Sequence, residues 1–352
     1  MSARGGQLCL SNPDVLKIAT AGVRQWARDE PEADIISVSE TDSHGHCQCG
    51  NCRILIDREG SHAGPLLHFV NRIADNIREE FPELAVGMLA YNHMYSRIPP
   101  KHVRPRPNVV VRLVTSGCCR FHSLATCDSD FAYEGSVQFR DDITGWKNAG
   151  DSLYVWNYVA DYGDFLAPLP NLHILQSDIR FFIEHNVKGI FEQGISGMPG
   201  GEFAELRSYL LARCLWQPEC DWQQVMDEFL EAYYGAAATS IRAYIDLLHE
   251  QVAGSDFHSQ RAQPAAYLTR AVVDRADQLF DKAAAAVADD PVLLLRVKKE
   301  RLGIALTRIY RHEELLPSPE AHEAAVEAFA RTAEACGISH LAEGNQRPLE
   351  KE

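Results

Sequence analysis

The chain has 352 residues, 46% of them hydrophobic and 24% charged, which is the composition of an ordinary globular protein. Its formal net charge of −15 argues against a nucleic-acid partner, because phosphate binding requires a basic surface. No apolar run approaches the roughly 20 residues that cross a bilayer, so we expect no membrane partner.

The first residues of the chain contain no apolar segment typical of an export signal, and this predicts a cytoplasmic protein. An extracellular or periplasmic location remains open if the chain is a piece of a longer precursor. Ten cysteines are dispersed too widely for a disulfide framework, and in the cytoplasm reduced thiols are expected.

Short apolar runs with strand character alternate with amphipathic helices through the first 200 residues. Asn12 and Pro13 predict the start of the first helix, since Asn caps and Pro occupies the first turn. Five such alternations predict an α/β fold with parallel strands joined by right-handed crossovers. The expected strands cover residues 35–39, 85–91, 108–114, 153–158 and 187–192.

Beyond residue 200 the strand signal ends, and six amphipathic segments predict a C-terminal helical bundle. We therefore expect an α/β domain over residues 1–200, a helical region packed on it over 201–340, and a disordered tail over 341–352. The expected C-terminal helices cover residues 202–216, 221–234, 237–252, 264–286, 291–311 and 319–335.

Polar and aromatic side chains follow the ends of the expected strands. In parallel α/β folds these ends meet on the active-site side of the sheet. Two carboxylates with aromatic platforms suit glycosidic cleavage, in which an acid protonates the leaving oxygen and flat rings pack on the sugar. The alternatives are structural polar residues in a binding barrel and, for Glu192, a turn cap or a surface ion pair. The residues concerned are Glu40, Asp42, Tyr91, His93, Arg112, His122, Trp156, Asn157, Tyr158 and Glu192.

A loop after the first strand carries Cys47, Cys49 and Cys52 beside His46, enough soft ligands for a tetrahedral zinc site. The strong zinc signature has two C-x-x-C pairs, however, and this loop has one cluster. Free thiols and no cofactor are therefore the leading interpretation, with zinc and an internal disulfide as the alternatives.

Residues 9 to about 250 resemble the bacterial family catalogued as domain of unknown function 4838. None of the motifs that carry this resemblance is specific alone, but the combination of these motifs is specific. The motifs are Val38-Ser39-x-x-Asp42 with the C-x-C-x-x-C loop, Asn108 to Arg112, Phe191-Glu192-Gln193-Gly194 and Pro199-Gly200-Gly201-Glu202-Phe203.

This resemblance implies a partial (β/α)₈ barrel of the TIM type and kinship with glycoside hydrolase family 163. Those enzymes are endo-β-N-acetylglucosaminidases that retain configuration and use the substrate acetamide as nucleophile. The resemblance therefore implies a glycan or small-sugar substrate, with Glu192 and Asp42 as the acid/base and orienting pair. The expected sugar-binding residues are Tyr91, His93, Arg112, His122, Trp156, Tyr158 and Glu202.

Two features of the chain depart from the family pattern. Gly117 stands where members often carry a Glu, and five strands are visible where a closed barrel has eight. A homo-oligomer or a companion chain would complete the barrel, unless helices cover its open edges. The alternative function is a catalytically impaired carbohydrate-binding or interaction protein on a degenerate barrel.

Overall fold

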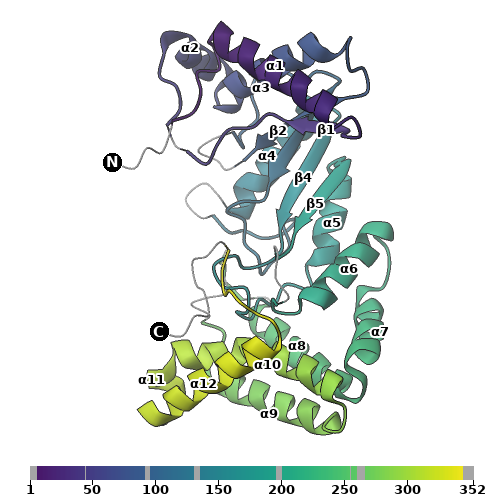
Figure 1. Ribbon diagram of the computed structural model, residues 1–352, viewed down its shortest axis with the longest axis vertical. Helices are drawn as coiled ribbons and strands as arrows, with labels where there is room; N and C mark the ends of the chain where they lie inside the picture. The colour runs from purple at the N-terminus through teal and green to yellow at the C-terminus, as the bar shows by residue number, and fades with distance from the viewer. Residues whose placement is uncertain are drawn as a thin grey trace. The chain divides into compact units, whose positions relative to one another are not determined.

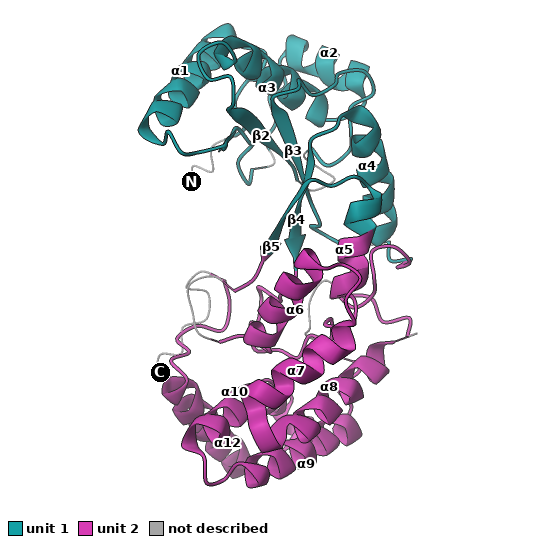
Figure 2. Cartoon of the chain, turned by 90° about the vertical axis from the view of Figure 1, so that its right-hand side faces the viewer, with its two compact units in different colours: residues 1–118, 128–158, 181–192 teal, residues 119–127, 159–180, 193–352 magenta. Residues whose placement is uncertain are grey.

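The computed structural model describes residues 6–43, 45–91, 96–130, 135–195, 200–253, 255–259 and 266–343. The chain forms two compact units that interleave along the sequence (Figure 2). Unit 1 contains residues 1–118, 128–158 and 181–192, and unit 2 contains residues 119–127, 159–180 and 193–352. Most of the expected tail, residues 344–352, lies outside the described residues.

Unit 1 is built on a five-stranded sheet whose strand order follows the sequence (Figure 1). The strands are parallel and the sheet curls into a half-barrel, so the prediction of a partial barrel with about five parallel strands is confirmed. The strands are β1 (Ile35–Ser37), β2 (Ala85–Ala90), β3 (Val109–Val114), β4 (Leu153–Tyr158) and β5 (Gly189–Gln193).

The two faces of this sheet differ in exposure because side chains alternate along each strand. On β4, Leu153, Val155 and Asn157 are buried, whereas Tyr154, Trp156 and Tyr158 are only partly buried. We call these the buried face and the open face of the sheet. On the open face, a Cβ atom added to Gly189 would lie only 2.4 Å from the Tyr154 ring. This is too close for any side chain, so glycine is required at position 189.

The helices of unit 1 contribute their apolar sides to its core. In α1 (Pro13–Asp29), Leu16, Val23 and Ala27 are buried, and the Asn12 side chain accepts a hydrogen bond from the Asp14 amide as an N-cap should. Helix α3 (Ala63–Ile77) packs against β2 and β3, and its apolar side chains are almost all buried. The other helices are α2 (Gly50–Glu59), α4 (Ser136–Ala149) and α5 (Leu175–Glu184), the last divided between the units.

Unit 2 contains the C-terminal helical region, which the sequence predicts. Its helices pack in sequence, α6 on α7, α7 on α8, α8 on α9 and α9 on α10, and α12 packs on α10 (Figure 2). They are α6 (Ala204–Trp216), α7 (Trp222–Tyr234), α8 (Ala238–Val252), α9 (Arg270–Ala286), α10 (Pro291–Tyr310), α11 (His312–Leu315) and α12 (Pro319–Ala335), with a 3₁₀ turn at Gly235–Ala237. Across the described parts of both units, no helix combines the length and apolar character that a membrane span requires.

Candidate functional site

Glu192 lies on β5, one residue before the strand ends. Asn157 occupies the equivalent position on β4, and its Nδ2 donates a hydrogen bond of 2.9 Å to Glu192 Oε2. The other carboxyl oxygen, Oε1, is shielded from solvent and meets no hydrogen-bond partner among the described residues. Asn157 thus fixes one oxygen of the carboxyl group, and the other oxygen is available to carry a proton.

Asn157 is itself held by the neighbouring strand. Thr115, which directly follows β3, donates its hydroxyl to Asn157 Oδ1 at 2.9 Å, and that hydroxyl accepts a hydrogen bond from the Tyr158 amide at 3.0 Å. A chain of side-chain hydrogen bonds therefore links the carboxyl ends of β3, β4 and β5. The sequence places Asn157 beside Trp156 and Tyr158 at a strand end, but it does not reveal that Asn157 positions the Glu192 carboxyl group.

The pKa of Glu192 is raised from 4.5 to about 7. Burial is the larger cause, since a shielded carboxylate loses hydration, and the hydrogen bond from Asn157 opposes it by stabilising the charged form. A carboxyl group with this pKa is partly protonated at neutral pH, which is the state that a general acid needs.

The expected sugar-binding residues of the sheet lie on the open face. Trp156 contacts Phe191 edge to face, with ring centroids 5.0 Å apart, and lies 6.4 Å from Tyr158. Arg112 shares this face, because it pairs in register with Tyr154. Since Trp156 and Asn157 are consecutive on a strand, the aromatic rings and the Glu192 carboxyl project from opposite faces of the sheet.

Asp42 lies on the loop after β1, where its side chain is exposed. Glu40, two residues earlier, is sheltered, and burial raises the pKa of its carboxyl to about 7. Its Oε1 lies 3.5 Å from His46 Nδ1, and the His46 ring stacks on His62 at 4.0 Å. These three side chains line a small pocket in unit 1.

The remaining expected residues have separate environments. Tyr91 is half-buried after β2, and its backbone amide donates to Ser96 Oγ at 3.2 Å. Glu202 is buried in unit 2 in an ion pair with Arg207 at 2.8 Å, and burial raises the pKa of its carboxyl. His122 also belongs to unit 2, whereas His93 lies outside the described residues.

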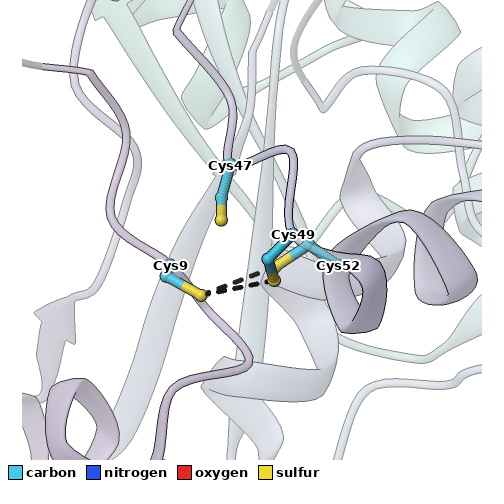
Figure 3. Close-up of side chains that lie close together, drawn as sticks. All are labelled: Cys9, Cys47, Cys49 and Cys52. Atoms are coloured by element: carbon cyan, nitrogen blue, oxygen red, sulfur yellow. Dashed lines mark hydrogen bonds between the residues drawn. The ribbon is translucent and has the colours of Figure 1, made fainter.

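Cys9, which precedes α1, adds a fourth cysteine to the three of the cysteine loop. The sequence alone does not connect Cys9 with that loop. Its Sγ lies 3.7 Å from Cys49 Sγ and 3.9 Å from Cys52 Sγ. Together with Cys47, the four sulfur atoms lie within 4.8 Å of one another and point toward a common centre (Figure 3). His46 belongs to the pocket around Glu40 and is not in this group of four potential ligands.

Comparison with known proteins gives one relationship. None of the curated proteins compared with the chain matches it. The family model described as domain of unknown function (DUF4838) matches residues 2–246, more than two-thirds of the chain, a span that contains the whole half-barrel together with Cys9, Cys47, Cys49 and Cys52. The chain therefore belongs to the DUF4838 family.

Proposed function

We propose that the chain is a glycoside hydrolase that acts on β-linked N-acetylhexosamine glycans, in the manner of glycoside hydrolase family 163. The observation that carries this proposal is the environment of Glu192. Its carboxyl has a pKa of about 7, a fixed partner in Asn157 and a shielded oxygen at the carboxyl end of a parallel sheet. Those are the properties of a group that protonates a glycosidic oxygen.

In substrate-assisted cleavage the acetamide of the sugar attacks the anomeric carbon, so no carboxylate nucleophile is needed. Glu192 would donate its proton to the leaving oxygen and then accept a proton from water when the oxazoline intermediate is hydrolysed. Asp42 stays our candidate for the group that orients the acetamide. Because β1 and β5 are the two edges of the sheet, this role requires the sugar to lie between the ends of those strands.

A second candidate function is carbohydrate binding without turnover. It is favoured by the placement of Trp156 and Tyr158 on the open face, away from the face that carries Glu192. Aromatic rings beside Arg112 offer stacking and hydrogen bonding to a sugar without any acid. Gly117, where family members often carry a Glu, favours this function as well.

The two candidates differ in one assay. Wild type, Glu192→Gln and Glu184→Gln are incubated with an aryl β-N-acetylglucosaminide and with an N-glycan, and product is measured. Glu184 is an exposed glutamate on α5 and controls for the loss of one charge. The hydrolase predicts that only Glu192→Gln loses turnover, by about 100-fold or more. If all three proteins bind glycan and none of them turns it over, the carbohydrate-binding function replaces the hydrolase function.

A further inference from the structure

We propose that Cys9, Cys47, Cys49 and Cys52 bind one zinc ion as four thiolates. Zinc bound by cysteine has bonds of about 2.3 Å, and a regular tetrahedron with such bonds has sulfur–sulfur edges of about 3.8 Å. Two edges measured in unit 1, from Cys9 to Cys49 and to Cys52, are 3.7 and 3.9 Å. The cysteines are unbonded, since a disulfide would bring two sulfur atoms to about 2.05 Å.

The surroundings of the four sulfur atoms suit thiolates. Ser11 Oγ lies 3.4 Å from the sulfur atoms of Cys9, Cys49 and Cys52, so one hydroxyl is available to donate to a ligand. Such a donor orients metal ligands and stabilises their charge.

Local structure explains how the ligands come together. Cys49 is the N-cap of α2 and Cys52 lies in its first turn, where the positive end of the helix dipole favours negative charge. Cys9 is brought to them by the segment before α1. Two residues earlier, the Gln7 side chain donates to the backbone oxygens of Thr41 and Ser43.

The inferred zinc is structural, because four protein ligands fill a tetrahedron and leave no position for water. It fastens the segment before α1 to the loop that follows β1. That loop carries Glu40 and Asp42, so the metal fixes one side of the proposed substrate site without taking part in the reaction.

An independent cluster in unit 2 has the composition of a Cys₂His₂ site. Cys119, His122, Cys127 and His258 place their ligand atoms within 4.8 Å of one another. Cys119 Sγ lies 3.5 Å from His122 Nδ1, and Cys127 Sγ lies 3.5 Å from His258 Nδ1. With zinc–nitrogen bonds of about 2.0 Å, a tetrahedral sulfur–nitrogen edge is about 3.5 Å long.

The orientation of His122 supports a second zinc ion there. Its Nε2 lies 3.1 Å from the backbone oxygen of Val252, which can only accept, so Nε2 carries the proton. The Nδ1 lone pair then faces the cluster, as a metal ligand requires. The two segments that supply ligands are also joined by a hydrogen bond of 3.0 Å from the Arg120 amide to the Ser259 oxygen. This assignment gives His122 a structural role in place of a sugar contact.

Metal analysis of untagged full-length protein, produced with zinc in the medium and purified without chelator, tests both sites. We expect about two zinc ions per chain in wild type and about one in either Cys49→Ser or Cys127→Ser. Cys214→Ser is the matched control, because Cys214 and Cys220 are also 3.8 Å apart but belong to no group of three or more potential ligands among the described residues. Unchanged zinc in Cys49→Ser overturns the first site, and unchanged zinc in Cys127→Ser overturns the second.

Cobalt identifies the ligands of each site. Replacing zinc by Co²⁺ gives sulfur-to-cobalt absorption that grows with the number of thiolates, so Cys127→Ser, with the four-cysteine site intact, should absorb about twice as strongly as Cys49→Ser. Equal intensities would contradict the two ligand sets.

Alkylation of wild type covers the case in which a variant fails to fold. Iodoacetamide with peptide mapping should modify Cys9, Cys49 and Cys127 only after a chelator is added, whereas modification of Cys336 should not depend on the chelator. Chelator-independent modification at both clusters, or a disulfide from Cys9 to Cys49, overturns the proposal. None of these measurements depends on hydrolase activity, so the metal sites and the proposed function can fail separately.

Discussion

Asn157 Nδ2 donates a hydrogen bond of 2.9 Å to Glu192 Oε2, and this bond joins the ends of β4 and β5 on the buried face of the sheet. It opposes the effect of burial on the carboxyl, since it stabilises the charged form of Glu192. The pKa of about 7 is therefore a balance between two effects that can be changed separately.

Replacing Asn157 by alanine should raise the pKa of Glu192 above 7, by on the order of one unit, because burial then acts without the opposing hydrogen bond. A general acid works when protonated, so its activity falls as pH rises through its pKa. The falling limb of the pH–rate profile should move to higher pH, and carbon NMR of labelled glutamate should show the same shift. Thr115→Val keeps the bond to Glu192 and should move the limb less. A limb that stays in place in Asn157→Ala would contradict this account.

Glu192 should also make stability depend on pH. Its pKa is about 7 in the folded protein and near 4.5 in the unfolded chain, so the folded state binds more protons between these values. The contribution of this proton to the free energy of unfolding is therefore present below pH 4.5 and is lost as pH rises through 7. Glu192→Gln, which cannot ionise, should be more stable than wild type above pH 7, by on the order of 1 to 3 kcal/mol.

Denaturant unfolding between pH 4 and pH 8 measures this difference. The advantage of Glu192→Gln should shrink toward acid pH, where wild-type Glu192 is protonated in both states. The exposed control Glu184→Gln should show no comparable trend. An advantage that grows toward acid pH would show that Glu192 has a lowered pKa.

The five strands could be predicted because each is a short run of apolar residues bounded by turn residues, a pattern that reports burial directly. The sequence does not predict helix α2, because only Cys52 and Glu59 are buried within Gly50–Glu59, and so few buried positions leave no helical period to detect. Its C-terminal boundary at Gly60, which adopts a φ of 71°, is a stop signal that the sequence does contain.

The site was predicted in part. The sequence names the residues at the strand ends but does not assign each of them to a face of the sheet. Alternation along β4 does contain this information, because it implies that Trp156 and Asn157 point in opposite directions. Cys9 could not be joined to the cysteine loop, because α1 and β1 lie between them in sequence and only tertiary packing brings them together. The group in unit 2 depends in the same way on contacts over more than 100 residues, from Cys127 to His258.

Trp156 should contribute to glycan affinity if the open face binds sugar. Trp156→Ala should weaken binding about tenfold, which corresponds to about 1.4 kcal/mol for the lost ring. Glu192→Gln should leave affinity nearly unchanged, since that side chain is on the other face. Isothermal titration with a chitooligosaccharide measures both. Trp26→Ala, at a residue of α1 that is 53% exposed, is the control for loss of a surface tryptophan. Equal affinities for Trp156→Ala and wild type would exclude the open face as the sugar platform.

The half-barrel contains a buried ion pair, and removing one partner of it should be costly. Arg97 is fully buried, its Nε donates to Asp142 Oδ2 at 2.6 Å, and its Nη1 donates to the Ser116 oxygen at 2.8 Å. Arg97→Met leaves the Asp142 carboxylate buried without that partner, so the free energy of unfolding should fall by about 3 to 5 kcal/mol. Denaturant unfolding of the variant measures this loss.

The surface pair of Arg28 and Glu80 provides the matched control. Its atoms are equally close, at 2.6 Å, but the Arg28 side chain is 56% exposed, so solvent screens the interaction. Arg28→Met should therefore cost less than about 1 kcal/mol. The double variant Arg97→Met/Asp142→Leu should recover most of the loss seen in Arg97→Met, because it removes the buried charge that the single change leaves behind. If the double variant is no more stable than Arg97→Met, the cost of that change arises from lost packing and not from the buried Asp142 carboxylate that has lost its arginine.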